Sequence, residues 1–467
     1  MNKNKLTKIL LWLAITVVII TVFSESSPLY KLNPWSDANI YLTIGRDLLN
    51  GGKLYTDLFD HKGPILYFVY TIASCISSTS FFGVYLLEII CMYFLLYYSE
   101  KILSLFTTKR HIIAISALGI ITVTSKAFSY GGGSVEELFL PIFQIANYIC
   151  LNKIIRNESF SSKECIYIGL FAGLSFLTKF TLSGYFLGVA ICLIIYQFNK
   201  DRSKLLTCIT YTFISFILVL CISSLYFVIN HNMNDFIDTY FKFNLFSYKS
   251  PNSLPVRLFA MCKAVLFYIK NNILLVSLSL LSILYSIIHF KKSYITLYIV
   301  STFISWYFIS FIGSKFIAYY ILPISIYIVF GILLLDDSKY KNAICIGISI
   351  CCIFMSNNIK DLNRKDYVQY EFANIIGDSS FLVYKGYDQG FYMVANENPG
   401  CRYFTTTNGW LPNYEEYTLS CINEKQIEYL ISIDNELDLP NYKLILSETY
   451  KYDSTNKIYR LYKRTKQ

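Results

Sequence analysis

The sequence predicts a multi-pass α-helical membrane protein with a small α/β domain at its C-terminal end. Of its 467 residues, 54% are hydrophobic and only 15% are charged, a balance that is unusual for a soluble chain of this length. The apolar residues form long blocks separated by short polar loops. From Asn357 onward the composition changes to that of an ordinary soluble domain.

The apolar blocks predict about eleven membrane-spanning helices. A perpendicular span needs roughly 20 apolar residues, and loops rich in lysine and arginine stay on the cytoplasmic side. The predicted spans are residues 9–23, 82–106, 112–124, 138–155, 165–178, 181–198, 205–229, 273–288, 294–312, 316–335 and 343–355. The first block also has the layout of a cleavable signal peptide. In either case the polar stretch 24–81 and the C-terminal tail face outward.

Two parts of the chain depart from this pattern. The apolar stretch 65–76 is too short to cross, so we expect a helix that lies beside the membrane or re-enters it.

We assign residues 1–356 to a transmembrane catalytic domain and 357–467 to an extracytoplasmic α/β domain. Within the tail we expect buried strands at 381–384 and 442–445 and a helix over 415–431.

Charge and cysteine usage narrow the class of function. The net charge of +10 is spread through short loops rather than gathered on one face, so it indicates membrane orientation and no nucleic-acid partner. Most of the 13 cysteines lie in or beside apolar segments, where cysteine behaves as a small hydrophobe. Only Cys401 and Cys421 lie in polar sequence, and an oxidising exterior would allow them to pair. Whether they do so is left open.

The first exterior loop carries ionisable residues between two apolar segments. They include four carboxylates and a His-Lys pair: Asp37, Asp47, Asp57, Asp60, His61 and Lys62. Ionisable groups kept at a membrane border are functional candidates, although an ordinary solvated loop would also expose such side chains. A second acidic loop, with Glu136 and Glu137, is predicted to reach the same face of the membrane.

This arrangement suits the transfer of a sugar from a polyprenyl-phosphate carrier. Such a transfer needs a carboxylate to take the proton of the attacking hydroxyl and cations to stabilise the departing phosphate. Asp37 is the candidate base, and Lys62, Lys179 and Lys315 are candidate phosphate ligands. No nucleophilic serine or cysteine is required, because phosphate is already a good leaving group.

A divalent metal is an alternative use of the carboxylates. Glu136 and Glu137, together with Asp57, Asp60 and His61, offer the hard ligands that Mg²⁺ or Mn²⁺ prefers. The competing interpretation is structural: the two glutamates would stabilise the positive N-terminal end of the helix that follows them. No cofactor is therefore assigned with certainty.

The first loop resembles that of GT-C fold glycosyltransferases of the protein mannosyltransferase and aminoarabinose transferase type. The residues that carry the resemblance are Asp37, Tyr41, Gly45, Arg46, Leu48, Leu49, Gly51, Tyr55, Asp57, Phe59, Asp60, His61, Lys62 and Pro64. Later segments follow in the family's order, with Glu136, Glu137, Lys179, Lys315, Tyr319 and Tyr320. The chain departs from the family at Gly63, where proline is usual, and at Ala318, where many relatives have histidine.

The resemblance implies an inverting transferase with Asp37 as catalytic base, Lys62 as a ligand of the donor phosphate, and Glu136 or Glu137 as a second acidic residue. The expected partners are a polyprenyl-phosphate sugar, membrane lipids, and a glycan, lipid or protein acceptor at the outer face of a bacterial cytoplasmic membrane. The expected catalytic residues are Asp37, Glu136 and Glu137, and the expected substrate-binding residues are Asp57, Asp60, His61, Lys62, Lys179, Lys315 and Tyr319. A transporter or flippase of lipid-linked saccharides is the alternative, and an inactive scaffold is a third interpretation.

Overall fold

The chain folds into two compact units that interleave along the sequence. The computed structural model describes residues 3–128, 132–247, 253–313, 316–356, 359, 361–406, 411, 413–452 and 455–465. The first unit comprises Met1–Leu29, Tyr85–Ser223 and Ser250–Lys360, and the second comprises Tyr30–Val84, Ser224–Lys249 and Asp361–Gln467. Most of the stretch predicted as the first exterior loop therefore shares one compact unit with the tail. The predicted boundary between residues 356 and 357 lies close to Asp361, where the last segment of the second unit begins.

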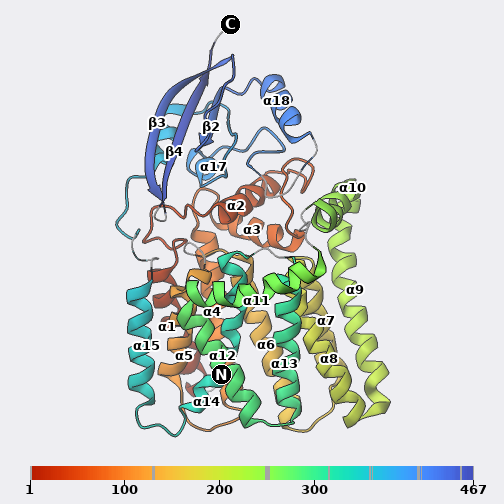
Figure 1. Cartoon of the computed structure of the whole chain (residues 1–467). Helices are drawn as coiled ribbons and strands as arrows, with labels where there is room; N and C mark the ends of the chain where they lie inside the picture. Colours follow the sequence, from red (N-terminus) through yellow and green to blue (C-terminus); the bar gives the residue numbers. More distant parts are fainter. Residues whose placement is uncertain are drawn as a thin grey trace. The chain divides into compact units, whose positions relative to one another are not determined.

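The first unit is a bundle of helices that run side by side (Figure 1). Its helices are α1 (Lys3–Phe23), α4 (Phe82–Leu103), α5 (Ile112–Thr124), α6 (Val135–Ile155), α7 (Ser162–Phe176), α8 (Ser183–Lys200), α9 (Leu205–Ile229), α11 (Leu254–Asn271), α12 (Ile273–His289), α13 (Tyr294–Phe311), α14 (Ile328–Leu334) and α15 (Lys341–Met355). Helices α4 and α9 each extend a few residues into the second unit. All eleven segments predicted to span contain helix, whereas α11 lies outside them.

Six helical segments among the described residues are long and apolar enough to cross a membrane, fewer than the eleven predicted. They are Lys5–Phe23, Phe82–Leu103, Val135–Ile155, Phe180–Lys200, Arg202–Ile229 and Tyr294–Phe311. Other apolar helices fall short of 18 residues, among them Ile112–Thr124, Ile273–His289 and Lys341–Met355. The apolar segment Ala318–Leu334 begins as a 3₁₀ helix over Ala318–Tyr327. The five other predicted segments, 112–124, 165–178, 273–288, 316–335 and 343–355, contain helices of fewer than 18 residues.

The surface of α9 is consistent with a membrane protein. Only 22% of its most apolar window is buried, and large side chains such as Leu206 (74% exposed) and Ile229 (72% exposed) are left uncovered. A soluble protein rarely exposes contiguous apolar surface of this kind. Several helices of the bundle could therefore lie in a bilayer.

In the second unit, α2 (Ser36–Leu49) packs closely against α3 (Pro64–Ile76). A Cβ atom added at Gly45 would lie 2.6 Å from the carbonyl carbon of Tyr70, so only glycine permits this approach of the two backbones. Helix α3 has 13 residues, about 20 Å at 1.5 Å per residue. It is shorter than a bilayer core, as the sequence predicted.

The tail of the second unit forms a mixed four-stranded sheet in the order β1-β2-β4-β3. Its elements are α16 (Val368–Ile376), β1 (Phe381–Val383), α17 (Phe391–Ala395), α18 (Tyr414–Glu424), β2 (Tyr429–Ile433), β3 (Tyr442–Tyr452) and β4 (Thr455–Arg464). Strand β1 pairs with β2 in parallel, and the other pairs are antiparallel. The strand predicted at 381–384 is confirmed and buried.

Two details of the predicted tail are wrong. The helix predicted over 415–431 ends at Glu424, because residues 429–433 form the buried strand β2, which pairs on both sides. The strand at 442–445 exists, but Leu444 and Ile445 are 40% and 42% exposed. Strand β3 lies at the edge of the sheet, so its apolar residues gain little cover.

One ionic arrangement joins the first loop to the tail within this unit. Asp388 accepts hydrogen bonds from the backbone N–H groups of Gly390 (3.0 Å) and Phe391 (2.9 Å), at the start of α17. Arg46 donates to the carbonyl oxygen of Tyr392 (3.0 Å), the second residue of α17, and to that of Glu397, two residues beyond the helix. The short helix and the segment after it are thus held by one anion and one cation.

A disulfide closes the segment that follows α17. Cys401 and Cys421, whose pairing the sequence left open, are bonded, with Cα atoms 6.0 Å apart. The bond spans 20 residues of sequence and reaches α18. A cross-link of this length restricts the unfolded chain and stabilises the fold by about 3 kcal/mol.

We expect replacement of both Cys401 and Cys421 by alanine to lower the unfolding free energy of the second unit by about 3 kcal/mol. Thermal unfolding of the purified chain, with and without reductant, measures this difference. The matched control is Cys75→Ala, which removes an exposed free thiol from α3. If reductant leaves the unfolding temperature of the wild-type chain unchanged, the disulfide does not contribute to stability.

Candidate functional site

The second unit gathers Asp37, Tyr41, Asp60, His61 and Lys62, which we call the first-loop cluster. Asp37 is the second residue of α2, where the positive end of the helix dipole favours a carboxylate. Tyr41, one turn further along, donates a hydrogen bond of 3.2 Å to the Oδ2 atom of Asp37. The ammonium of Lys62 lies 6.0 Å from the centre of the Tyr41 ring. Asp37 is half-buried, whereas His61 and Lys62 are almost fully buried.

The carboxylate of Asp60 is held in its ionised form. Burial acts to raise its pKa, but the charge of Lys62 and hydrogen bonds from His61 and Tyr67 outweigh burial and lower the pKa below its usual range. Tyr67 donates to Asp60 Oδ2 at 2.6 Å, and His61 Nδ1 lies 3.2 Å from Oδ1. Asp60 therefore carries a full negative charge at neutral pH.

His61 is neutral at pH 7. Burial and the neighbouring Lys62 lower the pKa of His61. Together they outweigh Asp60 and Asp37, which raise it. The hydrogen bond to Asp60 places the imidazole proton on Nδ1, so Nε2 remains an acceptor. The imidazole thus orients the loop without adding a second cation beside Lys62.

Tyrosine hydroxyls fix the backbone of the loop that carries these residues. Tyr55 donates to the carbonyl oxygen of Lys62 at 2.7 Å, and the amide of Lys62 donates to the Tyr67 hydroxyl at 3.1 Å. Both tyrosines are fully buried. Because both backbone groups of Lys62 are hydrogen-bonded to buried side chains, the position of its side chain is constrained.

Asp57 lies apart from the first-loop cluster. Its carboxylate accepts the backbone N–H of Lys53 at 2.7 Å and is exposed. It lines a polar cleft of about 520 Å³ in the second unit. The other residues that line this cleft are Thr56, Pro399, Gly400, Arg402, Tyr417, Ser420, Cys421, Glu424 and Lys425. The cleft combines two acidic side chains, two basic side chains and one exposed aromatic ring.

In the first unit, Glu136 and Lys179 form a buried ion pair. The Lys179 ammonium contacts Glu136 Oε1, and the two side chains are 9% and 2% exposed respectively. The same ammonium lies 3.7 Å from the ring centre of Tyr320 and 5.0 Å from that of Tyr319. The charge of Lys179 is therefore already balanced by a carboxylate and two aromatic faces.

Glu137 has the structural role that the sequence left open. Ser134 caps the start of α6 by accepting the amide of Glu137 at 3.1 Å, and Glu137 Oε2 accepts the amide of Gly133 at 3.0 Å. This is the geometry of a helix N-terminus stabilised by a polar cap and a carboxylate. Glu136, next to it, faces Lys179 instead.

The remaining predictions concern Lys315 and a metal. Lys315 lies outside the described residues. Within the parts of the chain that the structure describes, no three side chains of histidine, cysteine, aspartate or glutamate gather as metal ligands would. We derive no step through a metal.

Three buried charged residues received no role in the sequence analysis, although Arg46 is one of the residues that carry the family resemblance. Arg46 and Asp388 are 3% and 0% exposed, but they are separated by most of the chain. Glu88 is fully buried in α4, where it accepts hydrogen bonds from Ser24 (2.5 Å) and Ser26 (3.0 Å). A carboxylate inside an apolar block is a recognisable signal, so Glu88 could have been identified from the sequence.

The comparisons with known proteins do not assign a family. A scan against protein-family models gives no match, and a search of curated proteins finds no significant relative.

The substitution Asp60→Asn tests the electrostatics of the first-loop cluster. Because the folded pKa of Asp60 is depressed, its stabilisation is fully present above the unfolded pKa, about 3.9, and is lost as the pH falls toward the folded pKa. We expect the variant to be about 2 kcal/mol less stable at pH 7, with a smaller difference at pH 3. Thermal unfolding at both pH values measures it.

Asp57→Asn is the matched control, since Asp57 lies in the same loop but is exposed. Its effect on stability is expected to be small at both pH values. An Asp60→Asn deficit that stays constant from pH 7 to pH 3 would contradict the ionised state assigned to Asp60.

Proposed function

We propose that this chain is a membrane glycosyltransferase of GT-C type, which moves a sugar from a polyprenyl-phosphate carrier to a hydroxyl of a cell-surface glycan, lipid or protein. The observation that carries the proposal is the first-loop cluster. It combines a half-buried carboxylate, Asp37, with a buried cation, Lys62, on a backbone fixed by buried tyrosines.

Each residue of the cluster has a role in this reaction. Asp37 accepts the proton of the acceptor hydroxyl as its oxygen forms a bond to the anomeric carbon of the sugar. The bond between that carbon and the phosphate oxygen breaks, and the electron pair leaves with the polyprenyl phosphate. Lys62 stabilises the negative charge that develops on the departing phosphate. Tyr41 orients Asp37, and the Asp60–His61 pair orients the loop.

The proposed placement is the bacterial cytoplasmic membrane, with eleven helical spans and the second unit outside. Three observations support this placement. Helix forms in each of the eleven predicted segments, and the apolar surface of α9 is uncovered. The disulfide between Cys401 and Cys421 is typical of an oxidising compartment, since disulfides are rare in the cytosol.

The polar cleft beside Asp57 is the proposed acceptor site. Its charges balance, with Asp57 and Glu424 against Arg402 and Lys425, which suits a polar ligand without strong net charge. The ring of Tyr417 is 47% exposed and is supported from behind by Tyr403, whose centroid lies 5.1 Å away. An exposed aromatic ring that packs against a second ring and lies among hydrogen-bonding groups is typical of a surface that binds a saccharide.

We expect Asp37→Asn to lower turnover by about 100-fold or more, because general bases contribute at least this much, while the chain still folds. The matched control is Asp47→Asn, which changes a carboxylate at the other end of α2. Mass spectrometry of polyprenyl-phosphate sugars in cells that lack the gene, complemented with each variant, measures turnover. Wild type and Asp47→Asn should clear an accumulated lipid-linked monosaccharide, and Asp37→Asn should not.

Other outcomes of this experiment would overturn the proposal. If a longer lipid-linked glycan accumulates instead and Asp37→Asn clears it, the chain is a transporter of lipid-linked saccharides. If deletion of the gene changes no lipid-linked species, the chain is not a transferase of this class.

Tyr417→Ala tests the acceptor cleft. Loss of the ring should raise the KM for acceptor about tenfold, equivalent to about 1.4 kcal/mol, with kcat little changed. Tyr417→Phe keeps the ring and serves as control. Equal acceptor KM values for the alanine variant and the wild type would exclude the cleft as the acceptor site, without bearing on Asp37.

A further inference from the structure

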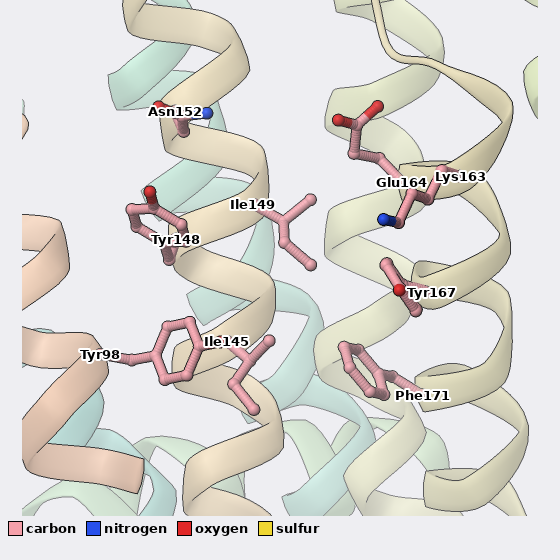
Figure 2. Close-up of a pocket in the computed structure, with 9 residues that line it drawn as sticks. All are labelled: Tyr98, Ile145, Tyr148, Ile149, Asn152, Lys163, Glu164, Tyr167 and Phe171. Atoms are coloured by element: carbon pink, nitrogen blue, oxygen red, sulfur yellow. The ribbon is translucent and has the colours of Figure 1, made fainter. Parts of the chain in front are cut away.

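The first unit contains a groove between α4, α6 and α7 that the proposed reaction does not use. Figure 2 shows its lining residues, with Ile145 and Ile149 projecting from α6 toward the helix that carries Tyr167 and Phe171. The groove has a volume of about 470 Å³ and is half open to the surface. The complete lining is Tyr98, Ile145, Tyr148, Ile149, Asn152, Lys163, Glu164, Tyr167 and Phe171.

The groove is polar at one end and apolar at the other. Asn152, near the end of α6, and Lys163, at the start of α7, mark the polar end (Figure 2). Phe171 lies eight residues after Lys163, about 12 Å further along the helix at 1.5 Å per residue. This gradient matches an amphiphile whose polar head and apolar chain bind side by side with the helices.

The polar end attracts an anion. Glu164 is already engaged by Lys153 at 3.3 Å and by the amide of Ser161 at 2.7 Å, so its charge is offset. Lys163 lies 5.8 Å from the ring centre of Tyr167. The side chain of Lys163 is exposed, and no salt bridge joins it to a carboxylate in the described parts of the chain.

A second lysine stands beside two of the lining tyrosines. The ammonium of Lys101, in the last turn of α4, lies 5.2 Å from the ring centre of Tyr148 and 5.9 Å from that of Tyr98. Asn152 Oδ1 is buried without a hydrogen-bond partner among the described residues. The groove thus offers one lining cation, Lys163, and one buried acceptor. Lys101 adds a second cation next to the tyrosines of its wall, and together these groups fit a phosphate diester and a donating hydroxyl of a head group.

We propose that this groove is a binding site for an anionic glycerophospholipid. The acyl chain lies along Ile145, Ile149 and Phe171, and the phosphate lies between Lys101 and Lys163. The loop between α6 and α7 carries the lysines and arginine that predict a cytoplasmic position, and anionic lipids concentrate in the cytoplasmic leaflet. The site is independent of the proposed transfer reaction.

The test uses the purified full chain exposed to an equimolar mixture of phosphatidylglycerol and phosphatidylcholine with identical acyl chains. Native mass spectrometry counts the lipids retained. The variants are Lys101→Gln with Lys163→Gln, and Ile149→Trp, which fills the apolar part of the groove. Lys200→Gln is the matched control, because it removes an exposed lysine from the end of another helix, α8.

The wild-type chain should retain phosphatidylglycerol in preference to phosphatidylcholine. The double lysine variant should bind phosphatidylglycerol about 25-fold more weakly, a factor of about five for each lysine, and the control should match the wild type. Ile149→Trp should reduce retention of both lipids. Equal retention of the two lipids, or an equal loss in Lys200→Gln, would overturn the assignment.

Discussion

The second unit depends on the burial of Arg46 and Asp388 around the five residues of α17. Removing two such groups from water is costly, and the cost is offset only when each finds several well-placed partners. Arg46 finds two carbonyl oxygens and the side chain of Asn398, and Asp388 finds two amide groups. Because Arg46 belongs to α2 and its partners to the tail, this arrangement holds segments from opposite ends of the sequence in one unit.

The same constraint positions the candidate chemistry. Asp37 and Arg46 lie on one helix, so anchoring the C-terminal half of α2 fixes the N-terminal turn that presents Asp37. The close packing of α2 on α3 at Gly45 extends this rigidity to Tyr67 and the loop before it. By contrast, the Glu136–Lys179 pair in the first unit neutralises its own charge. The first-loop cluster is therefore the stronger candidate for proton transfer.

Local sequence patterns predicted most of the helices, because the hydropathy of each residue indicates whether it is buried in a bilayer or in a protein core. They also predicted that Asp60, His61 and Lys62 act together, since neighbours in sequence cannot lie far apart. They failed where the deciding contact is distant. Residues 429–431 of the buried strand β2 were predicted as helix because the partners of this strand, β1 and β4, are not visible in a short window. The contacts of Arg46 with the tail and the burial of Asp388 were missed for the same reason.

The interleaving of the two units has a consequence for the order of synthesis. The ribosome completes the first loop early, but the tail begins only at residue 361. At about 5–20 residues per second, the loop waits for tens of seconds before its partner emerges. During that interval α3 already packs on α2, but the guanidinium of Arg46 lacks its native acceptors. Nascent chains are thus most exposed to proteases and chaperones at this stage, until the segment with Tyr392, Glu397 and Asn398 has emerged.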